Sequence, residues 1–163
     1  MDDLKELFHQ TYEGEAKASL RLKAFAEKAR EEGYLQIAKL FQVIAFSEEI
    51  HGIRAFKMLE GYQSTEKNLE ASFQSETSVA AVAYREFHKK ALKLNREKEA
   101  LIFSQAQDVE ETHSRLYKNA MNNMLEGQEI SYHVCEICGY VAENQLPEVC
   151  PVCGAKKEKF LKF

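Results

Sequence analysis

The feature that most constrains the fold of this chain is a helical segment that occurs twice. Six residues of the first half recur 62 positions later in the second half. They are Phe25, Ala29, Ala38, Phe41, Glu48 and His51, which correspond to Phe87, Ala91, Ala100, Phe103, Glu110 and His113. Six matches at one fixed offset indicate an internal repeat of one structural unit.

Each copy of the repeat has the pattern of two helices joined by a short turn. Apolar residues recur at helical spacing, and residues 1–130 contain no proline. Gly33 is predicted to end the first helix in the left-handed conformation, and a second break surrounds Gly61. A third helix is predicted over about 66–94 and a fourth over about 96–126. We therefore predict an all-α antiparallel four-helix bundle over residues 1–130.

A glutamate and a histidine lie three positions apart in each copy, in "FSEEIH" (Glu48, His51) and "DVEETH" (Glu110, His113). Residues at this spacing share a helix face, so each pair directs a carboxylate and an imidazole to the same place. An isolated E-x-x-H also occurs on many solvent-exposed helix faces. The equivalent position of the two pairs within the repeat is what favours a metal site.

A metal site in a bundle needs a further carboxylate from the first helix of each hairpin. Glu15 lies 33 residues before Glu48, and Glu76 lies 34 residues before Glu110. A π-bulge between Glu76 and Phe87 would absorb this slip of one residue. Four carboxylates and two imidazoles suit two Fe or Mn ions, whereas the same groups buried without metal would be costly.

The remaining histidines do not fit the repeat. His9 and His88 have no counterpart in the other half and are predicted to lie at the surface or at the edge of the core. His133 lies beside the first cysteine pair, but four cysteines already complete a tetrahedral set, so it is not included among the ligands.

Composition excludes several classes of function. The net charge is −4 and no basic block occurs, which argues against a nucleic-acid partner. No apolar run approaches the roughly 20 residues needed to cross a bilayer, so no membrane partner is expected. The N-terminal "MDDLKELFHQ" has no signal-peptide core, and we therefore expect a cytoplasmic protein.

The tail, residues 131–163, is predicted to form a separate small metal-binding domain. All four cysteines lie there as two C-x-x-C pairs, Cys135 with Cys138 and Cys150 with Cys153. In a reducing compartment this pattern indicates a metal site with four sulfur ligands rather than disulfides. A structural zinc ribbon and a single redox-active iron both fit the spacing.

Taken together, these segments resemble the rubrerythrin family over nearly the whole chain. The similar stretches are "GE" with Glu15, "AEKAREEGYLQIAKLF", the paired E-x-x-H motifs, "TEKNLEASFQSET" and "CEICGY…PEVCPVCGAKKEKF". The resemblance implies a ferritin-like bundle with a di-iron centre, followed by a rubredoxin-like domain with one iron in an Fe(Cys)4 site, for which zinc can substitute. It also implies reduction of hydrogen peroxide to water, with electrons from an external rubredoxin or an NAD(P)H-dependent reductase. Members form homodimers or higher homo-oligomers, and some exchange helical hairpins between chains.

The resemblance also assigns roles to individual residues. Glu48 and Glu110 match bridging carboxylates, and Tyr84 matches a catalytic-site tyrosine that hydrogen-bonds a ligand carboxylate. The matched di-iron ligands are Glu15, Glu48, His51, Glu76, Glu110 and His113. The matched ligands of the single iron are Cys135, Cys138, Cys150 and Cys153.

Two positions depart from the family pattern. Val79 stands where members usually carry a further glutamate, which holds one iron in the oxidised state while the first-half histidine holds it in the reduced state. Leu22 stands where the first half usually carries a tyrosine. The remaining donor set is symmetric and closer to bacterioferritin-type sites.

Three classes of function follow from these residues. The first is a peroxide reductase. The alternative is a ferroxidase or iron-handling protein, because the symmetric site resembles those of ferritins. The third is a non-catalytic bundle stabilised by metal, with a structural zinc tail. The tail argues against storage, since a ferritin cage needs no one-electron relay.

Overall fold

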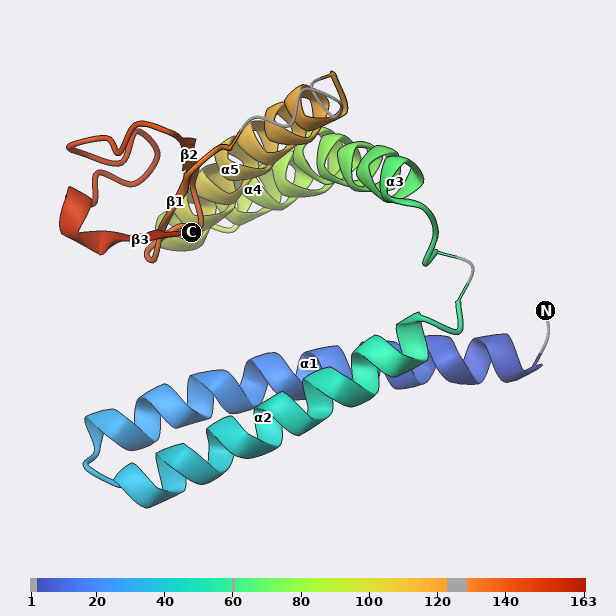
Figure 1. Cartoon of the computed structure of the whole chain (residues 1–163). Helices are drawn as coiled ribbons and strands as arrows, with labels where there is room; N and C mark the ends of the chain where they lie inside the picture. The colour runs from blue at the N-terminus through green and yellow to red at the C-terminus, as the bar shows by residue number, and fades with distance from the viewer. Residues whose placement is uncertain (1–2, 60, 123–128) are drawn as a thin grey trace. The chain divides into compact units, whose positions relative to one another are not determined.

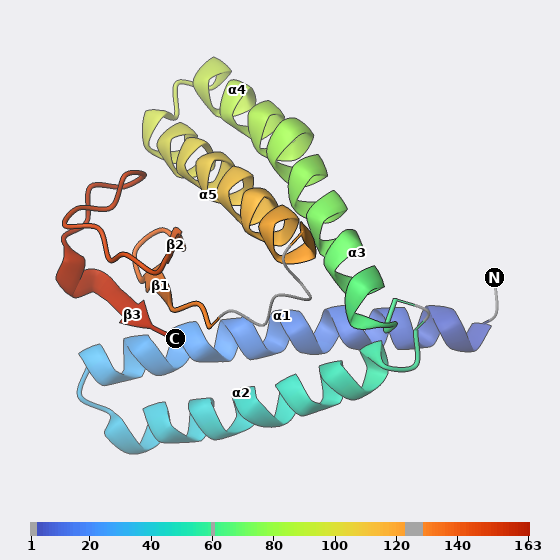
Figure 2. The ribbon, with the colours of Figure 1, turned by 45° about the horizontal axis from the view of Figure 1, so that its top comes forward.

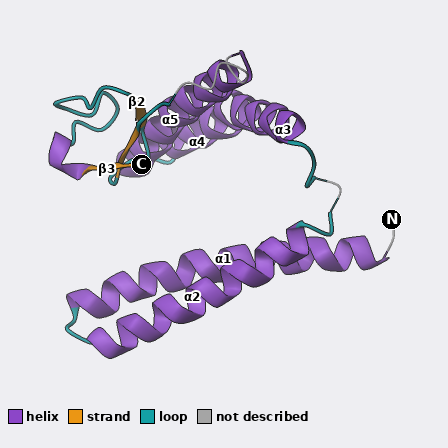
Figure 3. Ribbon diagram, in the orientation of Figure 1, coloured by secondary structure: helices purple, strands orange, loops and turns teal. Residues whose placement is uncertain are grey.

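The computed structural model describes residues 3–59, 61–122 and 129–163, in which long helices precede a small strand domain (Figures 1 and 3). The chain divides into two compact units, Met1–Ser64 and Thr65–Phe163. The predicted order, helical rods followed by a small domain with the cysteines, is confirmed. The division into domains 1–130 and 131–163 stays a prediction.

The first unit is an antiparallel hairpin of α1 (Asp3–Glu31) and α2 (Leu35–Phe56), which run side by side in Figures 1 and 2. Small side chains fill the contact between the two helices and let them approach closely. Those that are buried are Ser19, Ala26 and Ala29 on α1, and Ala38, Ala45, Gly52 and Ala55 on α2. Two aromatic pairs flank this interface, with ring centroids 5.7 Å apart for Phe25–Phe41 and 5.1 Å apart for Tyr12–Phe56.

Gly33 ends α1 as predicted. Its φ is +83°, and the following N–H of Tyr34 donates to the carbonyl of Ala29 at 2.8 Å. The second unit has the same turn 62 residues later, where Asn95 has a φ of +56° and the N–H of Arg96 donates to Ala91 at 3.0 Å. Asparagine tolerates the left-handed region better than most residues, so this turn forms without glycine.

The predicted third helix is one rod made of α3 (Thr65–Ser78), a π-helical segment η1 (Val79–Tyr84) and α4 (Arg85–Lys93). The π-helical segment lies between Glu76 and Phe87, which confirms the predicted bulge. α5 (Glu97–Asn122) packs along this rod. The predicted end of the fourth helix, near residue 126, lies outside the described residues.

The small domain is an antiparallel sheet in the order β2-β1-β3 with two cysteine loops. Its strands are β1 (Tyr132–Cys135), β2 (Val141–Glu143) and β3 (Phe160–Lys162), and the short helix η2 (Lys157–Lys159) leads into β3. β1 therefore delivers the first cysteine from the centre of the sheet.

Large apolar side chains remain exposed on both helical units. Leu20 and Phe46 of the first unit are 69% and 64% exposed, and Val82 and Ile102 of the second are 64% and 63% exposed. None of the helices in the described ranges contains an apolar stretch long enough to cross a membrane.

The repeat predicts that equivalent core positions respond alike to overpacking. Ala38 and Ala100 are each 2% exposed, so Ala38→Leu and Ala100→Leu should each lower the free energy of unfolding by about 1–3 kcal/mol. Lys39→Leu, one residue away on the exposed surface, should change it by less than about 0.5 kcal/mol. Denaturant unfolding of the three variants measures this, and a Lys39→Leu cost equal to the other two would contradict the packing described.

Candidate metal centres

The first unit brings Glu15, Glu48 and His51 together. One donor atom from each lies within 4.8 Å of the others. His51 Nδ1 is 3.1 Å from Glu48 Oε2 and 3.9 Å from Glu15 Oε1. The pair on α2 is one helical turn apart, and Glu15 reaches it from α1 because the two helices are closely packed.

Gly52 creates the close approach at this point. A Cβ added to Gly52 would lie 3.4 Å from the Cβ of Glu15 and 3.8 Å from the backbone nitrogen of Ala16. These are ordinary contact distances, so a methyl group would fit here, and a larger side chain would press on the carboxylate-bearing segment of α1. Gly52 directly follows His51 in the sequence. The position where α1 packs closely against α2 is therefore next to the imidazole of the triad.

The second unit brings Glu76, Glu110 and His113 together in the same way. Their donor atoms also lie within 4.8 Å of one another, and His113 Nδ1 is 3.0 Å from Glu110 Oε2. Ser114 stands at the position equivalent to Gly52, and its hydroxyl lies 2.8 Å from the hydroxyl of Thr77. A hydrogen bond between helices thus replaces the glycine contact of the first unit.

His113 differs from His51 in its second nitrogen. Its Nε2 lies 3.4 Å from the carbonyl oxygen of Gly139, in the first cysteine loop. A carbonyl only accepts, so Nε2 is the donor in this hydrogen bond, while Nδ1 faces the Glu110 carboxylate at 3.0 Å and is the ring nitrogen on the side of the triad. The side chain of His113 is 27% exposed, whereas that of His51 is 51% exposed.

Without metal, the carboxylates of each triad interact unfavourably. Desolvation, a hydrogen bond with Glu110 and repulsion by Glu110 raise the pKa of Glu76 from 4.5 to about 7. Desolvation, together with Glu48, also raises the pKa of Glu15. In both triads the surroundings therefore disfavour the charged carboxylate, and a bound cation would offset this cost.

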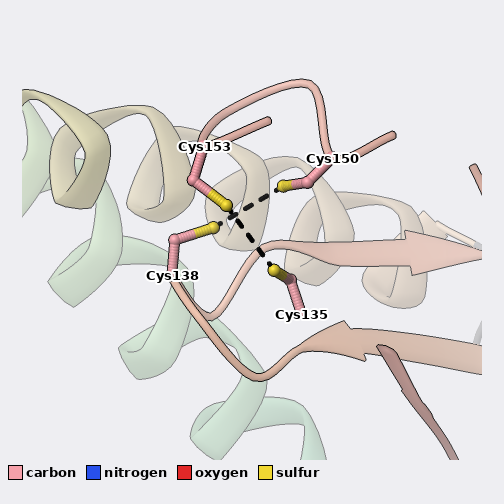
Figure 4. Close-up of side chains that lie close together, drawn as sticks. All are labelled: Cys135, Cys138, Cys150 and Cys153. Atoms are coloured by element: carbon pink, nitrogen blue, oxygen red, sulfur yellow. Dashed lines mark hydrogen bonds between the residues drawn. The ribbon is translucent and has the colours of Figure 1, made fainter. Parts of the chain in front are cut away.

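The four cysteines converge at the end of the small domain, as Figure 4 shows. Cys135 Sγ lies 3.7 Å from Cys153 Sγ, and Cys138 Sγ lies 3.6 Å from Cys150 Sγ. A disulfide would bring two sulfurs to about 2 Å, while a tetrahedral metal with bonds of about 2.3 Å separates them by about 3.8 Å. The observed spacing fits a metal.

The two cysteine loops have the same backbone. In each, a glycine with positive φ donates to the carbonyl of the first cysteine: Gly139 to Cys135 at 2.9 Å and Gly154 to Cys150 at 3.0 Å. Desolvation of Cys135 opposes ionisation, but N–H groups of Cys138 and Ile137 outweigh it and lower the pKa of this thiol. These N–H groups after the first cysteine are those that commonly stabilise a thiolate ligand.

The donor sets fit the metals that the sequence predicts. Two carboxylates and one imidazole in each triad match the donors that Fe and Mn accept, and four thiolates match Fe or Zn. Donors around one ion with bonds of about 2.1 Å lie no more than about 4.2 Å apart, so small side-chain rotations bring each triad within range.

The other residues singled out by the sequence lie as follows. His9 is exposed and His88 half-buried, which confirms the prediction for both. His133 is buried, and within the described ranges its Nδ1 has no hydrogen-bond partner. Tyr84, at the end of η1, packs its ring 6.0 Å from Phe87 and 6.4 Å from Phe103, and the role of its hydroxyl stays a prediction.

Sequence reasoning missed three residues that shape the site. Gly52 and Ser114 could have been found from the repeat, since they follow the two histidines directly. No local pattern indicates that Gly139 contacts His113, because that contact joins a loop to a helix 26 residues away.

Two antiparallel hairpins with equivalent E-x-x-H triads are typical of ferritin-like helical proteins that bind a pair of metal ions. A family model described as "Rubrerythrin" matches residues 6–121, and one described as "Rubrerythrin, rubredoxin-like domain" matches residues 133–161. The chain belongs to the rubrerythrin family.

Individual relatives agree with this assignment. The chain is 32% identical to nigerythrin of Nitratidesulfovibrio vulgaris, over 92% of this chain and 81% of that protein. It is 28% identical to rubrerythrin-2 of Clostridium acetobutylicum, over 97% of this chain and 95% of that protein. It also resembles the solved mixed-valence structure of nigerythrin, with a TM-score of 0.60, 30% identity, and coverage of 100% of this chain and 88% of that one.

The family establishes the class of cofactors and chemistry. The chain is an iron oxidoreductase with a ferritin-like helical part and a rubredoxin-like domain. Its cofactors are a di-iron carboxylate centre and one iron in an Fe(Cys)4 site, and the described residues include two Glu/His clusters and one cluster of four cysteines that could hold metal ions.

The raised pKa of Glu76 predicts how the metal-free protein responds to pH. The pKa of Glu76 is 4.5 in the unfolded chain and about 7 in the folded protein. Its contribution to the free energy of unfolding is therefore complete below pH 4.5 and is lost as the pH rises to about 7. Glu76→Gln should flatten this decline, whereas Glu111→Gln, on the exposed face, should not. Denaturant unfolding of metal-free protein between about pH 5 and about pH 8 measures it.

Metal binding should show the opposite trend. The metal ion displaces the proton of Glu76 when it binds. The affinity of the protein for metal should therefore rise with pH up to about pH 7, and fewer protons should be released on binding above that pH. Equal proton release from wild type and Glu76→Gln at about pH 6 would refute the assignment.

Proposed function

We propose that this protein reduces hydrogen peroxide to water at the di-iron centre, with electrons relayed one at a time through the Fe(Cys)4 centre. The observation that carries this proposal is the contact between His113 Nε2 and the carbonyl of Gly139 at 3.4 Å. Gly139 follows Cys138, so one hydrogen bond links a ligand loop of the one-electron site to a histidine of the carboxylate site.

In this proposal the ligands of the iron pair are the six triad residues, with Glu48 and Glu110 as the bridging carboxylates. The equivalence of the triads supports the assignment, since each supplies two carboxylates and one imidazole. The ligands of the single iron are the four cysteines. Tyr84 is proposed to hydrogen-bond a ligand carboxylate from its place at the end of η1.

The reaction needs two electrons and two protons for each hydrogen peroxide converted to two waters. When bound, the iron pair supplies two-electron chemistry for cleavage of the oxygen–oxygen bond. The chain holds the imidazole of His113 with Nδ1 facing Glu110, through the Gly139 carbonyl on Nε2. It also shields two of the four sulfur ligands from water, since Cys135 and Cys150 are 1% and 2% exposed, while Cys138 and Cys153 are half-buried.

The second candidate is a ferroxidase, which the symmetric donor set favours. It predicts oxygen-driven iron oxidation and gives the Fe(Cys)4 centre no role. Anaerobic reduction followed by two equivalents of hydrogen peroxide, enough to accept the three electrons of the fully reduced protein, separates the two functions. Peroxide reductase activity predicts fast reoxidation of the di-iron centre and then of the Fe(Cys)4 centre, whereas a ferroxidase would leave the latter reduced.

We further propose a homodimer or a higher homo-oligomer in the cytoplasm, with an external rubredoxin or an NAD(P)H-dependent reductase as electron donor. The exposed apolar side chains of both helical units support self-association, since such faces are normally covered. Exchange of hairpins between chains is compatible with it. Sedimentation of the holoprotein as a monomer at micromolar concentration would contradict the oligomer.

Loss of the relay should leave the bundle intact. Cys135→Ser should abolish peroxide turnover with an external donor protein, yet keep two irons per chain and the helical content, because α5 and the triads lie outside the cysteine loops. Ser131→Ala, in the same segment, is the matched control and should keep full turnover. Undiminished turnover by Cys135→Ser would refute the relay.

Val79 predicts a centre whose metal moves little between oxidation states. Valine offers no donor, so His51 should stay a ligand in both the oxidised and the reduced form. Val79→Glu should restore a redox-linked shift. Crystal structures of both forms measure this: an oxidised-state metal more than about 3 Å from His51, against a normal bond of about 2 Å, would contradict it.

A further inference from the structure

We propose that the edge of the small domain carrying Lys156, Lys159 and Lys162 is the docking surface for an acidic one-electron carrier protein. This surface, here called the lysine edge, includes the neighbouring apolar side chains Ile137 and Val149. The proposal rests on the proposed function, in which the Fe(Cys)4 centre takes electrons from outside.

The lysine edge passes directly beside both cysteine loops. Lys156 forms a β-bridge with Val149, the residue before Cys150. The N–H of Glu136, the residue after Cys135, donates to the carbonyl of Lys159 at 2.8 Å. Backbones paired in this way lie about 5 Å apart, so a protein bound over these lysines is within electron-transfer distance of the sulfur ligands.

The opposite side of the cysteine loops faces α5. A Cβ on Gly139 would lie 3.8 Å from Val109, and Tyr140, Pro151 and Val152 line a cavity of about 650 Å³ with residues of α5. Figures 1 and 2 both draw η2 on the side of the small domain away from α5. Electrons would thus leave toward His113 on one side, and within the second unit the other side is the one available to a donor.

Charge distinguishes the lysine edge from the rest of the chain. The whole chain has a net charge of −4, whereas residues 156–162 contain four lysines and one glutamate. Lys157 pairs with Glu148 at 2.9 Å, but in the described ranges Lys156, Lys159 and Lys162 form no ion pair. These three exposed lysines would repel a basic partner and attract an acidic one.

Apolar area beside the lysines completes the surface. Ile137 is 61% exposed and Val149 is 55% exposed, and each adjoins a cysteine of a different loop. A small apolar contact within charged surroundings suits a partner that binds briefly and then leaves, as an electron carrier must. In the transfer itself, the carrier loses one electron and the ferric ion of the Fe(Cys)4 site gains it, with no bond or proton exchanged.

Charge reversal tests the lysine edge. The triple variant Lys156→Glu, Lys159→Glu, Lys162→Glu is compared with Lys90→Glu, Lys93→Glu, Lys98→Glu, whose lysines lie on α4 and α5. Each reversal changes the charge by two, so both variants go from −4 to −10 and differ only in where the charge sits. Stopped-flow absorption follows reduction of the oxidised holoprotein's Fe(Cys)4 centre, and calorimetry measures binding, with an acidic rubredoxin as the probe and a basic c-type cytochrome as the control carrier.

The lysine-edge variant should bind the rubredoxin at least ten-fold more weakly and accept its electrons at least ten-fold more slowly than the helix variant. This difference should disappear when the salt concentration is raised from about 20 mM to about 500 mM. Equal effects of the two variants, or equal binding of the rubredoxin and the basic cytochrome by the wild type, would overturn the proposal. Peroxide turnover with a small chemical reductant, which needs no docking surface, should be the same in both variants. If neither variant nor the wild type turned over peroxide with this reductant, the proposed function would be wrong, and not the docking surface.

Discussion

The contact between a glutamate and a histidine one helical turn apart is the interaction on which the rest of this molecule depends. It occurs at 3.1 Å in the first unit and at 3.0 Å in the second, each time with a further carboxylate from the neighbouring helix. Desolvation first, and then the hydrogen bond and the repulsion by Glu110, raise the pKa of Glu76, so two carboxylates held together here carry both a desolvation cost and a mutual repulsion. A cation removes that repulsion, so the close approach of the helices in each hairpin becomes favourable once metal is bound.

The duplicated triads are equivalent in donors but not in surroundings. His113 contacts the carbonyl of Gly139, and its side chain is about half as exposed as that of His51. The carbonyl also accepts from Nε2 of His113 and so orients the ring with Nδ1 toward Glu110, an effect that groups hydrogen-bonded to metal ligands commonly have. Within the second unit, a hydrogen bond therefore joins the helical hairpin to a cysteine loop.

Most of the helical architecture could be predicted because the repeat carries it. The one-residue difference between the spacings of Glu15–Glu48 and Glu76–Glu110 was enough to locate η1. The turn at Asn95 was harder to identify, since asparagine in the left-handed region has a weaker signature than Gly33. The His113–Gly139 contact could not be predicted, because it depends on how a loop packs against a helix and no periodicity encodes that.

Mössbauer spectroscopy of the oxidised, iron-57-reconstituted holoprotein tests the central claim, that the two triads together hold one carboxylate-bridged iron pair beside a single iron on four cysteines. The spectrum should show one ferric ion in a sulfur environment and two ferric ions in nitrogen and oxygen environments, the latter coupled to a diamagnetic ground state. Two magnetically independent ferric ions in nitrogen and oxygen surroundings, or only one such ion per chain, would contradict a shared centre.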